Sequence, residues 1–267
     1  DNLKFDLAGI TEVRNKFFGT LTNTYNFFAL YANLDTYQLT GNLAEASLSE
    51  LDKWVLSKLQ SLILEVDEAY ANYEPTKAGR AIQDFVSDHL SNWYVRLGRR
   101  RFWNIAQTAE GGLDKAAAFE TLGYCLKAVS QLMSPIAPFY SDWLYRNMTN
   151  SSAENSVHLS DFPVANPDFI DQNLEISMDY AQRISSLVHS IRKGNRIKVR
   201  QPLSKILIPV LNPQVREQIS SVDELIKTEV NIKSVEYLDD ASGVLSKKVK
   251  PNFKALGPKF GKDKKNV

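Results

Sequence analysis

Apolar side chains recur at every third or fourth position through most of the first 150 residues, which is the spacing of one face of an α-helix. The pattern predicts five helices. They run from residue 10 to about 37, from 48 to 74, from 76 toward 103, from near 113 to 134, and onward from the prolines at 135 and 138. Because short connections favour antiparallel neighbours, we expect a mainly α fold built as an antiparallel helical bundle.

Two details of these helices can be checked against a structure. Ser47 and Glu50 have the spacing of a capping box, which predicts that the second helix begins there. In the fifth helix, Phe139, Trp143 and Leu144 are expected to face the protein interior.

The pattern changes after residues 151–167, a segment rich in Ser, Asn and Pro that is typical of a linker or surface loop. A further helix follows, and Gly194 stands where a left-handed C-terminal cap is expected. The predicted apolar stripe of this helix is Ile176, Tyr180, Ile184, Leu187 and Ile191. The segments LSKILIPV (203–210) and VNIKSVEYL (230–238) alternate, are rich in β-branched residues and flank a helical stretch, which predicts a β-α-β unit.

We therefore predict two domains, a helical bundle at residues 1–155 and a small α+β subdomain at 156–267 with a basic, lysine-rich end. The net charge is only +1, but residues 158–267 carry 18 Lys and Arg against 13 Asp and Glu. This excess attracts polyanions such as RNA. The lysine-rich terminus at residues 262–267 fits a solvated tail equally well.

Composition excludes several functional classes. No stretch approaches the ~20 apolar residues that cross a bilayer, so no membrane contact is expected. Cys125 is the only cysteine, which excludes an internal disulfide and a Cys-rich zinc site and fits the reducing cytoplasm. His89 lies on an apolar helix stripe and is interpreted as a core histidine, and GPKFGK at 257–262 departs from the phosphate-binding loop pattern. We predict no catalytic residue and no metal site.

The run SNWYVRLGRRRFW at 91–103 changes a packed helix face into a cationic and aromatic one. The apolar stripe of the third helix reaches Leu97, and the next positions at the same period are Arg100 and Arg101. Because guanidinium groups are rarely buried without partners, we expect the bundle to open there. Arginines suit phosphates and base edges, and aromatic rings suit the stacking of an unpaired base. The predicted RNA-binding residues of this run are Arg96, Arg99, Arg100, Arg101, Phe102 and Trp103.

A structural interpretation fits the same run. The arginines would form ion pairs with acids such as Asp84 or Asp88, and the two aromatic rings would pack under a neighbouring helix. A second basic segment, RKGNRIKVR at 192–200, is predicted to contact RNA phosphates. Its predicted contact residues are Arg192, Lys193, Arg196, Lys198 and Arg200.

Four segments carry a resemblance to one known family. They are SNWYVRLGRRRFW at 91–103, LMSPIAPFYSDWLYRNM at 132–148, IRKGNRIKVRQPLSKI at 191–206 and VKPNFKALGPKFGK at 249–262. In this order they are similar to the C-terminal region of isoleucyl-tRNA synthetases, of the type found in eukaryotic cytosol and some bacteria. The resemblance covers essentially all of the chain, although the second segment is shared by class I synthetases for other large aliphatic amino acids.

The resemblance implies an anticodon-binding domain, followed by the small α+β unit, whose partner is the anticodon stem-loop of isoleucine tRNA. The family's HIGH and KMSKS motifs do not occur in this sequence, so we expect the chain to be inactive alone and to need no cofactor. The parent ligase, with its catalytic and editing domains, uses ATP and magnesium to join isoleucine to tRNA. Other members carry a cysteine-ligated zinc site, which one cysteine cannot form. The alternative function is a helical protein-interaction module with a basic docking surface.

Overall fold

The computed structural model divides the chain into two compact units, Asp1–Gln182 and Arg183–Val267. Within them it describes residues 6–43, 46–103, 109–149, 156–210 and 212–238. The predicted lysine-rich end and the segment VKPNFKALGPKFGK lie outside the described residues.

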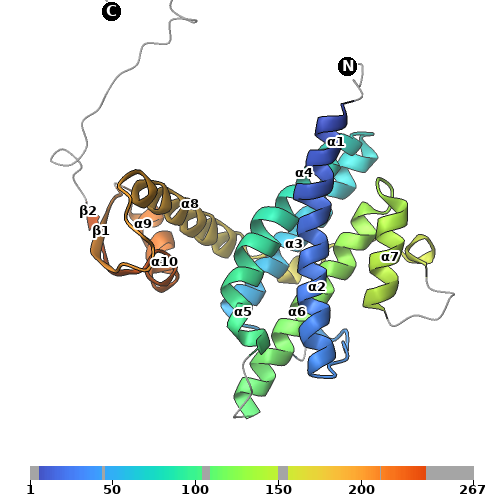
Figure 1. Ribbon diagram of the computed structural model, residues 1–267, viewed down its shortest axis with the longest axis horizontal. Coiled ribbons are helices and arrows are strands. Elements are labelled where there is room, and N and C mark those ends of the chain that lie inside the picture. Colours follow the sequence, from blue (N-terminus) through green and yellow to red (C-terminus); the bar gives the residue numbers. More distant parts are fainter. Residues whose placement is uncertain (1–5, 44–45, 104–108, 150–155, 211, 239–267) are drawn as a thin grey trace, which may run out of the picture. The chain divides into compact units, whose positions relative to one another are not determined.

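The first unit is the predicted helical bundle, drawn from blue to yellow in Figure 1. Its helices are α1 (Leu7–Val13), η1 (Arg14–Phe18), α2 (Gly19–Leu34), α3 (Glu50–Ala71), α4 (Pro75–Asp84), η3 (Phe85–Val95), α5 (Arg96–Trp103), α6 (Ala109–Met133), α7 (Pro138–Met148) and the one-turn helices η4 (Val157–Leu159) and η5 (Pro167–Phe169). The segments α4, η3 and α5 follow one another without a break and form one long helix. This helix packs against α2, α3 and α6.

The core of the bundle consists of apolar side chains from most of these helices; α1 and η5 contribute none. Its fully or almost fully buried members include Leu21, Trp54, Leu59, Phe85, Leu90, Tyr94, Phe102, Phe119, Leu122 and Val129. Burial of such side chains is the main source of stability of the fold.

The start of α3 lies two residues later than the sequence predicts. Ser49 is the N-cap, and its hydroxyl accepts a hydrogen bond from the backbone N–H of Asp52, while the Asp52 carboxylate accepts one from the Ser49 N–H. The prediction of Ser47 and Glu50 was therefore wrong, because an aspartate three residues after a serine closes the same reciprocal pair.

The long helix contains a π-helical stretch, η3, that changes which side chains face the core. A π-helix takes up more residues per turn than an α-helix, so the positions that follow it are rotated relative to the 3.6-residue period. After η3 the buried positions are Gly98 and Phe102, and Arg100 is exposed. The inward face of α5 thus lies about one residue later than the apolar stripe predicts.

The orientation of α7 also differs from the prediction. Leu144 is buried, as expected, but the side chain of Phe139 is 91% exposed and that of Trp143 is 42% exposed. Trp143 contacts the rings of Tyr25 and Tyr140 at the surface of the bundle.

The second unit contains the predicted β-α-β arrangement. The strands β1 (Leu203–Pro209) and β2 (Ile232–Leu238) pair in parallel, with Leu203 opposite Ile232. The connection holds two short helices, α9 (Pro213–Ser220) and α10 (Asp223–Val230).

Helix α8 (Gln172–Gly194) has a buried face that differs from the predicted stripe. Its buried side chains are Ser177, Met178, Ala181, Ser185, Val188 and Arg192, whereas Ile176, Leu187 and Ile191 are exposed. The helix ends in a Schellman motif in which the N–H of Ile197 bonds to the carbonyl of Arg192. The left-handed residue is Arg196, with φ 57°, instead of the predicted Gly194.

The boundary between the units lies inside α8, whereas the sequence predicts it after residue 155. The segment after 155 is attached to the helical bundle by hydrogen bonds. The Asn166 N–H donates to the Gln60 side chain at 2.9 Å, and the Asp171 N–H donates to the Ser57 hydroxyl at 2.9 Å. These contacts assign residues 156–182 to the first unit.

Candidate nucleic-acid interface

Four of the predicted RNA-binding residues lie on one exposed face of α5. Arg96, Arg99, Arg100 and Trp103 are spaced by three, four and seven residues, which places them on one side of the helix. All four are exposed, and Trp103 is 45% exposed although it is a large aromatic residue. This α5 face, defined by these four residues, therefore combines three cations with an accessible indole.

The guanidinium of Arg99 lies against two aromatic rings. Its central carbon is 5.6 Å from the ring centroid of Phe27 and 5.9 Å from that of Trp103. Such contacts stabilise a cation and restrict its position without using its N–H donors. Arg96 lies 5.6 Å from the ring of Trp93 and donates a hydrogen bond to the Asn92 carbonyl at 2.7 Å. The arginine donors of the α5 face are thus partly ordered before any ligand arrives.

Arg101 points in the opposite direction, into an ion-pair network. Its two terminal nitrogens donate to the two carboxylate oxygens of Asp52 at 2.8 and 2.7 Å, and its Nε donates to Asp114 at 3.0 Å. The Asp52 carboxylate is completely buried and also accepts a hydrogen bond of 2.6 Å from the Tyr94 hydroxyl. The prediction that Arg101 contacts RNA is therefore corrected: its donors hold α3, α5 and α6 together.

The charges of this network stabilise each other. Burial by itself raises the pKa of Asp52, but hydrogen bonds and the positive charge of Arg101, helped by Tyr94 and Ser49, outweigh it and leave the pKa below its ordinary value. Desolvation acts to lower the pKa of Arg101, and Asp52 overcomes it, so this pKa lies above its ordinary value. Both groups are ionised at neutral pH.

Phe102 is also turned inward, with none of its surface exposed. Its ring makes edge contacts with Phe27 at 5.1 Å and with Phe119 at 5.3 Å between centroids. No ring face is available to a base, so the prediction of Phe102 as a stacking residue is corrected. It belongs to the aromatic core that supports the α5 face.

The basic segment of the second unit, residues 192–200, also contains both a buried and several exposed cationic side chains. Arg192 is only 1% exposed, and its two terminal nitrogens donate to four backbone carbonyls, those of Lys198, Gln201, Val230 and Asn231. It therefore links the end of α8 to the end of α10, and its predicted RNA contact is corrected. The other predicted residues, Lys193, Arg196, Lys198 and Arg200, are exposed.

The sequence analysis missed two residues of α2 that border the α5 face. Phe27 contacts Arg99, and the ring of Tyr31 lies 6.5 Å from that of Trp103. They are spaced by four residues and therefore face α5 together. The apolar stripe that predicted this helix does not include Phe27 or Tyr31. Only their contacts with α5 show that they border the α5 face.

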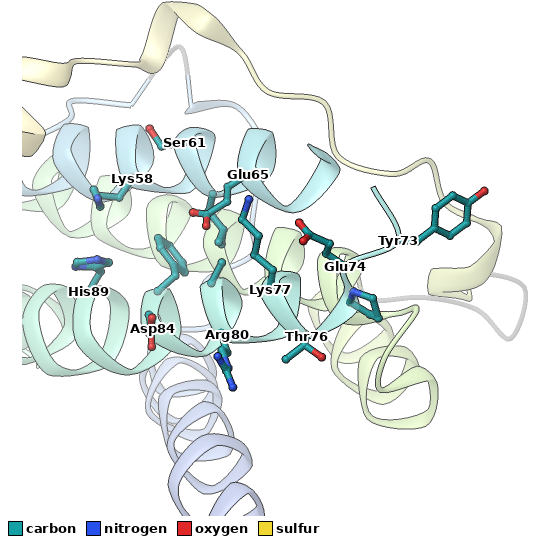
Figure 2. A pocket seen from close by; sticks show the side chains of 14 residues that line it. Lys58, Ser61, Glu65, Tyr73, Glu74, Thr76, Lys77, Arg80, Asp84 and His89 are labelled. Atoms are coloured by element: carbon teal, nitrogen blue, oxygen red, sulfur yellow. The ribbon is translucent and has the colours of Figure 1, made fainter. Parts of the chain in front are cut away.

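A groove of about 700 Å³ lies elsewhere in the bundle, between α3 and the α4–η3 segment. Figure 2 shows Glu65 of α3 and Lys77 of α4 extending into it from opposite sides, with Lys58 and His89 at one end. Its walls carry as many acidic as basic side chains, since Glu65, Glu74 and Asp84 balance Lys58, Lys77 and Arg80. Unlike the α5 face, the groove therefore has no charge preference for a polyanion.

His89 of this groove is held in its neutral form. Burial, followed by the charge of Lys58, lowers its pKa to about 4. The ring packs edge-on against Trp54 and Phe85, and its Nδ1 lies 3.4 Å from the Gln182 amide nitrogen. These contacts make His89 a half-buried packing residue at the end of the groove, whereas the sequence predicts a core position.

We expect the stability of the bundle to fall as the pH decreases from 6.5 toward 4. The unfolded chain binds a proton at His89 near the ordinary pKa of 6.5, whereas the folded protein does so only near 4. The stabilisation is therefore complete above pH 6.5, and up to about 3 kcal/mol is lost by pH 4. Urea unfolding over this range should show a weaker pH dependence in His89→Gln. The exposed His158→Gln serves as the control and should behave as the wild type.

Among the helices that the structure describes, none is long and apolar enough to cross a membrane. Within the same residues, no group of three or more His, Cys, Asp or Glu side chains is arranged to hold a metal ion.

Comparison with known proteins identifies the family. A profile of the family described as anticodon-binding domain of tRNA ligase matches residues 52–207. Over all of its own 267 residues, the chain is 58% identical to an isoleucine–tRNA ligase of Cytophaga hutchinsonii and 52% identical to that of Bacteroides thetaiotaomicron. Over 98% of its own residues, it is 35% identical to the isoleucine–tRNA ligase of Deinococcus radiodurans.

The chain spans about a quarter of the length of these relatives, covering 24%, 23% and 24% of them. The three relatives are bacterial and do not support the eukaryotic-cytosol part of the predicted type. The helical bundle, the β-α-β unit and the matches along the whole chain agree with one another. The chain belongs to the isoleucine–tRNA ligase family and contains its anticodon-binding domain.

Proposed function

We propose that the α5 face binds the anticodon loop of isoleucine tRNA. The observation that carries this proposal is Trp103, a large aromatic side chain that is 45% exposed beside an arginine held between two rings. Bases of a single-stranded loop can be turned outward and stacked on an aromatic ring, and their edges can be read by arginine. Arg99 and Arg100 supply the donors for base edges and phosphates.

The exposed cations of the second unit contribute contacts to the phosphate backbone of the same tRNA. Lys193, Arg196, Lys198 and Arg200 are accessible and lie within eight residues of one another in the sequence. Contacts of this kind give affinity without sequence preference, and the affinity falls as the salt concentration rises.

The full-length ligase would use this domain to select its tRNA, while its catalytic and editing domains join isoleucine to the tRNA with ATP and magnesium. Neither motif of the catalytic domain occurs in this chain, so we propose that it has no ligase activity of its own. The proposed compartment is the cytoplasm, where translation requires the charged tRNA.

Titration of the chain with isoleucine tRNA and with an anticodon-swapped tRNA, at two salt concentrations, tests the proposal. Anticodon-dependent affinity supports it. Affinity that depends only on salt indicates a generic basic surface. Absence of binding, in a protein that is folded by circular dichroism, favours the alternative function as a protein-interaction module.

The change Trp103→Ala is expected to weaken binding of isoleucine tRNA about tenfold or more, because one base stack contributes roughly 1–3 kcal/mol. Fluorescence anisotropy of labelled tRNA measures the loss. Phe139→Ala on α7 is the matched control, since this ring is 91% exposed but lies apart from the arginines of α5. Equal affinities of Trp103→Ala and the wild type would remove the α5 face from the proposal.

The change Lys198→Ala is expected to act differently. It should weaken the binding of isoleucine tRNA and anticodon-swapped tRNA alike and reduce the slope of log affinity against log salt by about one unit. Titrations of both tRNAs at four salt concentrations give this slope. A change that affects only one of the two tRNAs would contradict a phosphate contact.

A further inference from the structure

We infer that α2 supplies the second half of the base-binding surface, with Tyr31 and Leu34 extending the platform that begins at Trp103. This inference rests on the proposed function, and it adds a second element and a second base to the contact. The ligand is an RNA loop in which at least two neighbouring bases are unstacked. Trp103 would take one of them and the end of α2 the next.

The first observation is the exposed apolar surface at the end of α2. The side chains of Leu30 and Leu34 are 62% and 73% exposed, and they are spaced by four residues on one side of the helix. Tyr31 lies beside them in the sequence and is half-buried. Large aliphatic side chains that are this exposed and adjacent indicate a surface that becomes covered in a complex.

The second observation is that this surface is continuous with the α5 face. The rings of Tyr31 and Trp103 are 6.5 Å apart between centroids with an interplanar angle of 59°. Because the rings are not parallel, one base cannot stack on both, and each ring has to take its own base. Figure 1 shows the ends of α2 and α5 at the same end of the bundle.

The third observation concerns charge, which decides between RNA and a purely apolar partner. Arg99 lies against Phe27 and Trp103, at the border between the two helices. Two acids of the neighbouring elements form ion pairs: Asp35, which follows α2, pairs with Lys115, and Asp114 of α6 pairs with Arg101. An apolar strip bordered by arginines matches the bases and phosphates of a single-stranded loop.

The packing at the end of α2 provides the rigidity that such a platform needs. The buried carboxylate of Glu120 on α6 accepts hydrogen bonds from the Tyr37 hydroxyl at 2.8 Å and from the backbone N–H groups of Thr40 and Gly41 at 2.7 and 3.0 Å. These bonds anchor the segment that follows α2 to α6. The end of α2 is therefore fixed against α6 as well as against α5.

The test uses the 267-residue chain and isoleucine tRNA anticodon stem-loops that carry 2-aminopurine at one anticodon position each. Stacking on a ring changes the emission of this base, so each position reports its own contact. Tyr31→Leu is expected to weaken binding about fivefold or more and to abolish the emission change at a position next to the one that Trp103→Ala affects. Tyr31→Phe keeps the ring and should behave as the wild type.

Leu34→Ser is expected to weaken binding severalfold, and Leu64→Ser is its control, because Leu64 is 54% exposed on α3, away from the α5 face. Thermal unfolding of every variant separates lost binding from lost structure.

If Tyr31→Leu and Leu34→Ser bind as the wild type does while Trp103→Ala is impaired, the inference about α2 is wrong and the proposed function stands. If Trp103→Ala also binds normally, the proposed function fails as well. Capture of a protein on these leucines, without any change of tRNA affinity in their variants, overturns the inference.

Discussion

Replacement of Arg101 by methionine is expected to lower the free energy of unfolding by about 3–5 kcal/mol. The change removes the two hydrogen bonds to Asp52 and the contacts with Asp114, and it leaves the completely buried Asp52 carboxylate without its cation. Methionine retains most of the length of the side chain, so the loss reports charge and hydrogen bonding more than packing. Urea unfolding at neutral pH, followed by circular dichroism, measures it.

The adjacent residue provides the control for this prediction. Arg100 is exposed, so Arg100→Met should change the free energy of unfolding by no more than about 0.5 kcal/mol. Adding Asp52→Asn to Arg101→Met should recover part of the lost stability, because the uncompensated buried charge disappears. Equal unfolding midpoints for Arg100→Met and Arg101→Met would contradict the structural role of Arg101.

Sequence periodicity identified the helices of the bundle and the β-α-β unit because each of these elements has an apolar face. It failed where the phase of a helix changes. The π-helical stretch η3 rotates α5 relative to the preceding stripe, and hydrophobicity along the sequence contains no signal for this rotation. In α8 the buried face includes Ser185 and Arg192, while Leu187 and Ile191 are exposed. The apolar stripe of this helix therefore predicted the wrong buried face.

The run at 91–103 contains both inward-facing and outward-facing residues, and the sequence alone does not show which are which. The structural interpretation considered acids of the same helix, Asp84 and Asp88, whereas Arg101 pairs with Asp52 and Asp114 from two other helices. These partners lie 49 and 13 residues away. Pairing over such separations depends on tertiary packing and leaves no local pattern. The structural interpretation describes Arg101 and Phe102, whereas RNA contact by the exposed residues of the run stays a prediction.

Of the two aromatic residues that end the run, Phe102 faces the core and Trp103 faces solvent. Replacing them by alanine should therefore have different effects on stability and on tRNA binding. Phe102→Ala should lower the free energy of unfolding by about 3–5 kcal/mol, because it opens a cavity between Phe27 and Phe119 in a completely buried site. Trp103→Ala should cost less than about 1 kcal/mol, since the ring is 45% exposed. Urea unfolding of both variants measures the contrast.

In tRNA titrations the order of the two variants should reverse. Under conditions in which both are folded, Phe102→Ala should retain most of its affinity for isoleucine tRNA, whereas Trp103→Ala should lose about tenfold or more. Folding is confirmed by circular dichroism in the titration buffer. If Phe102→Ala is fully folded and loses as much affinity as Trp103→Ala, the buried ring takes part in binding, and the assignment of the outward face of α5 as the base-binding surface is wrong.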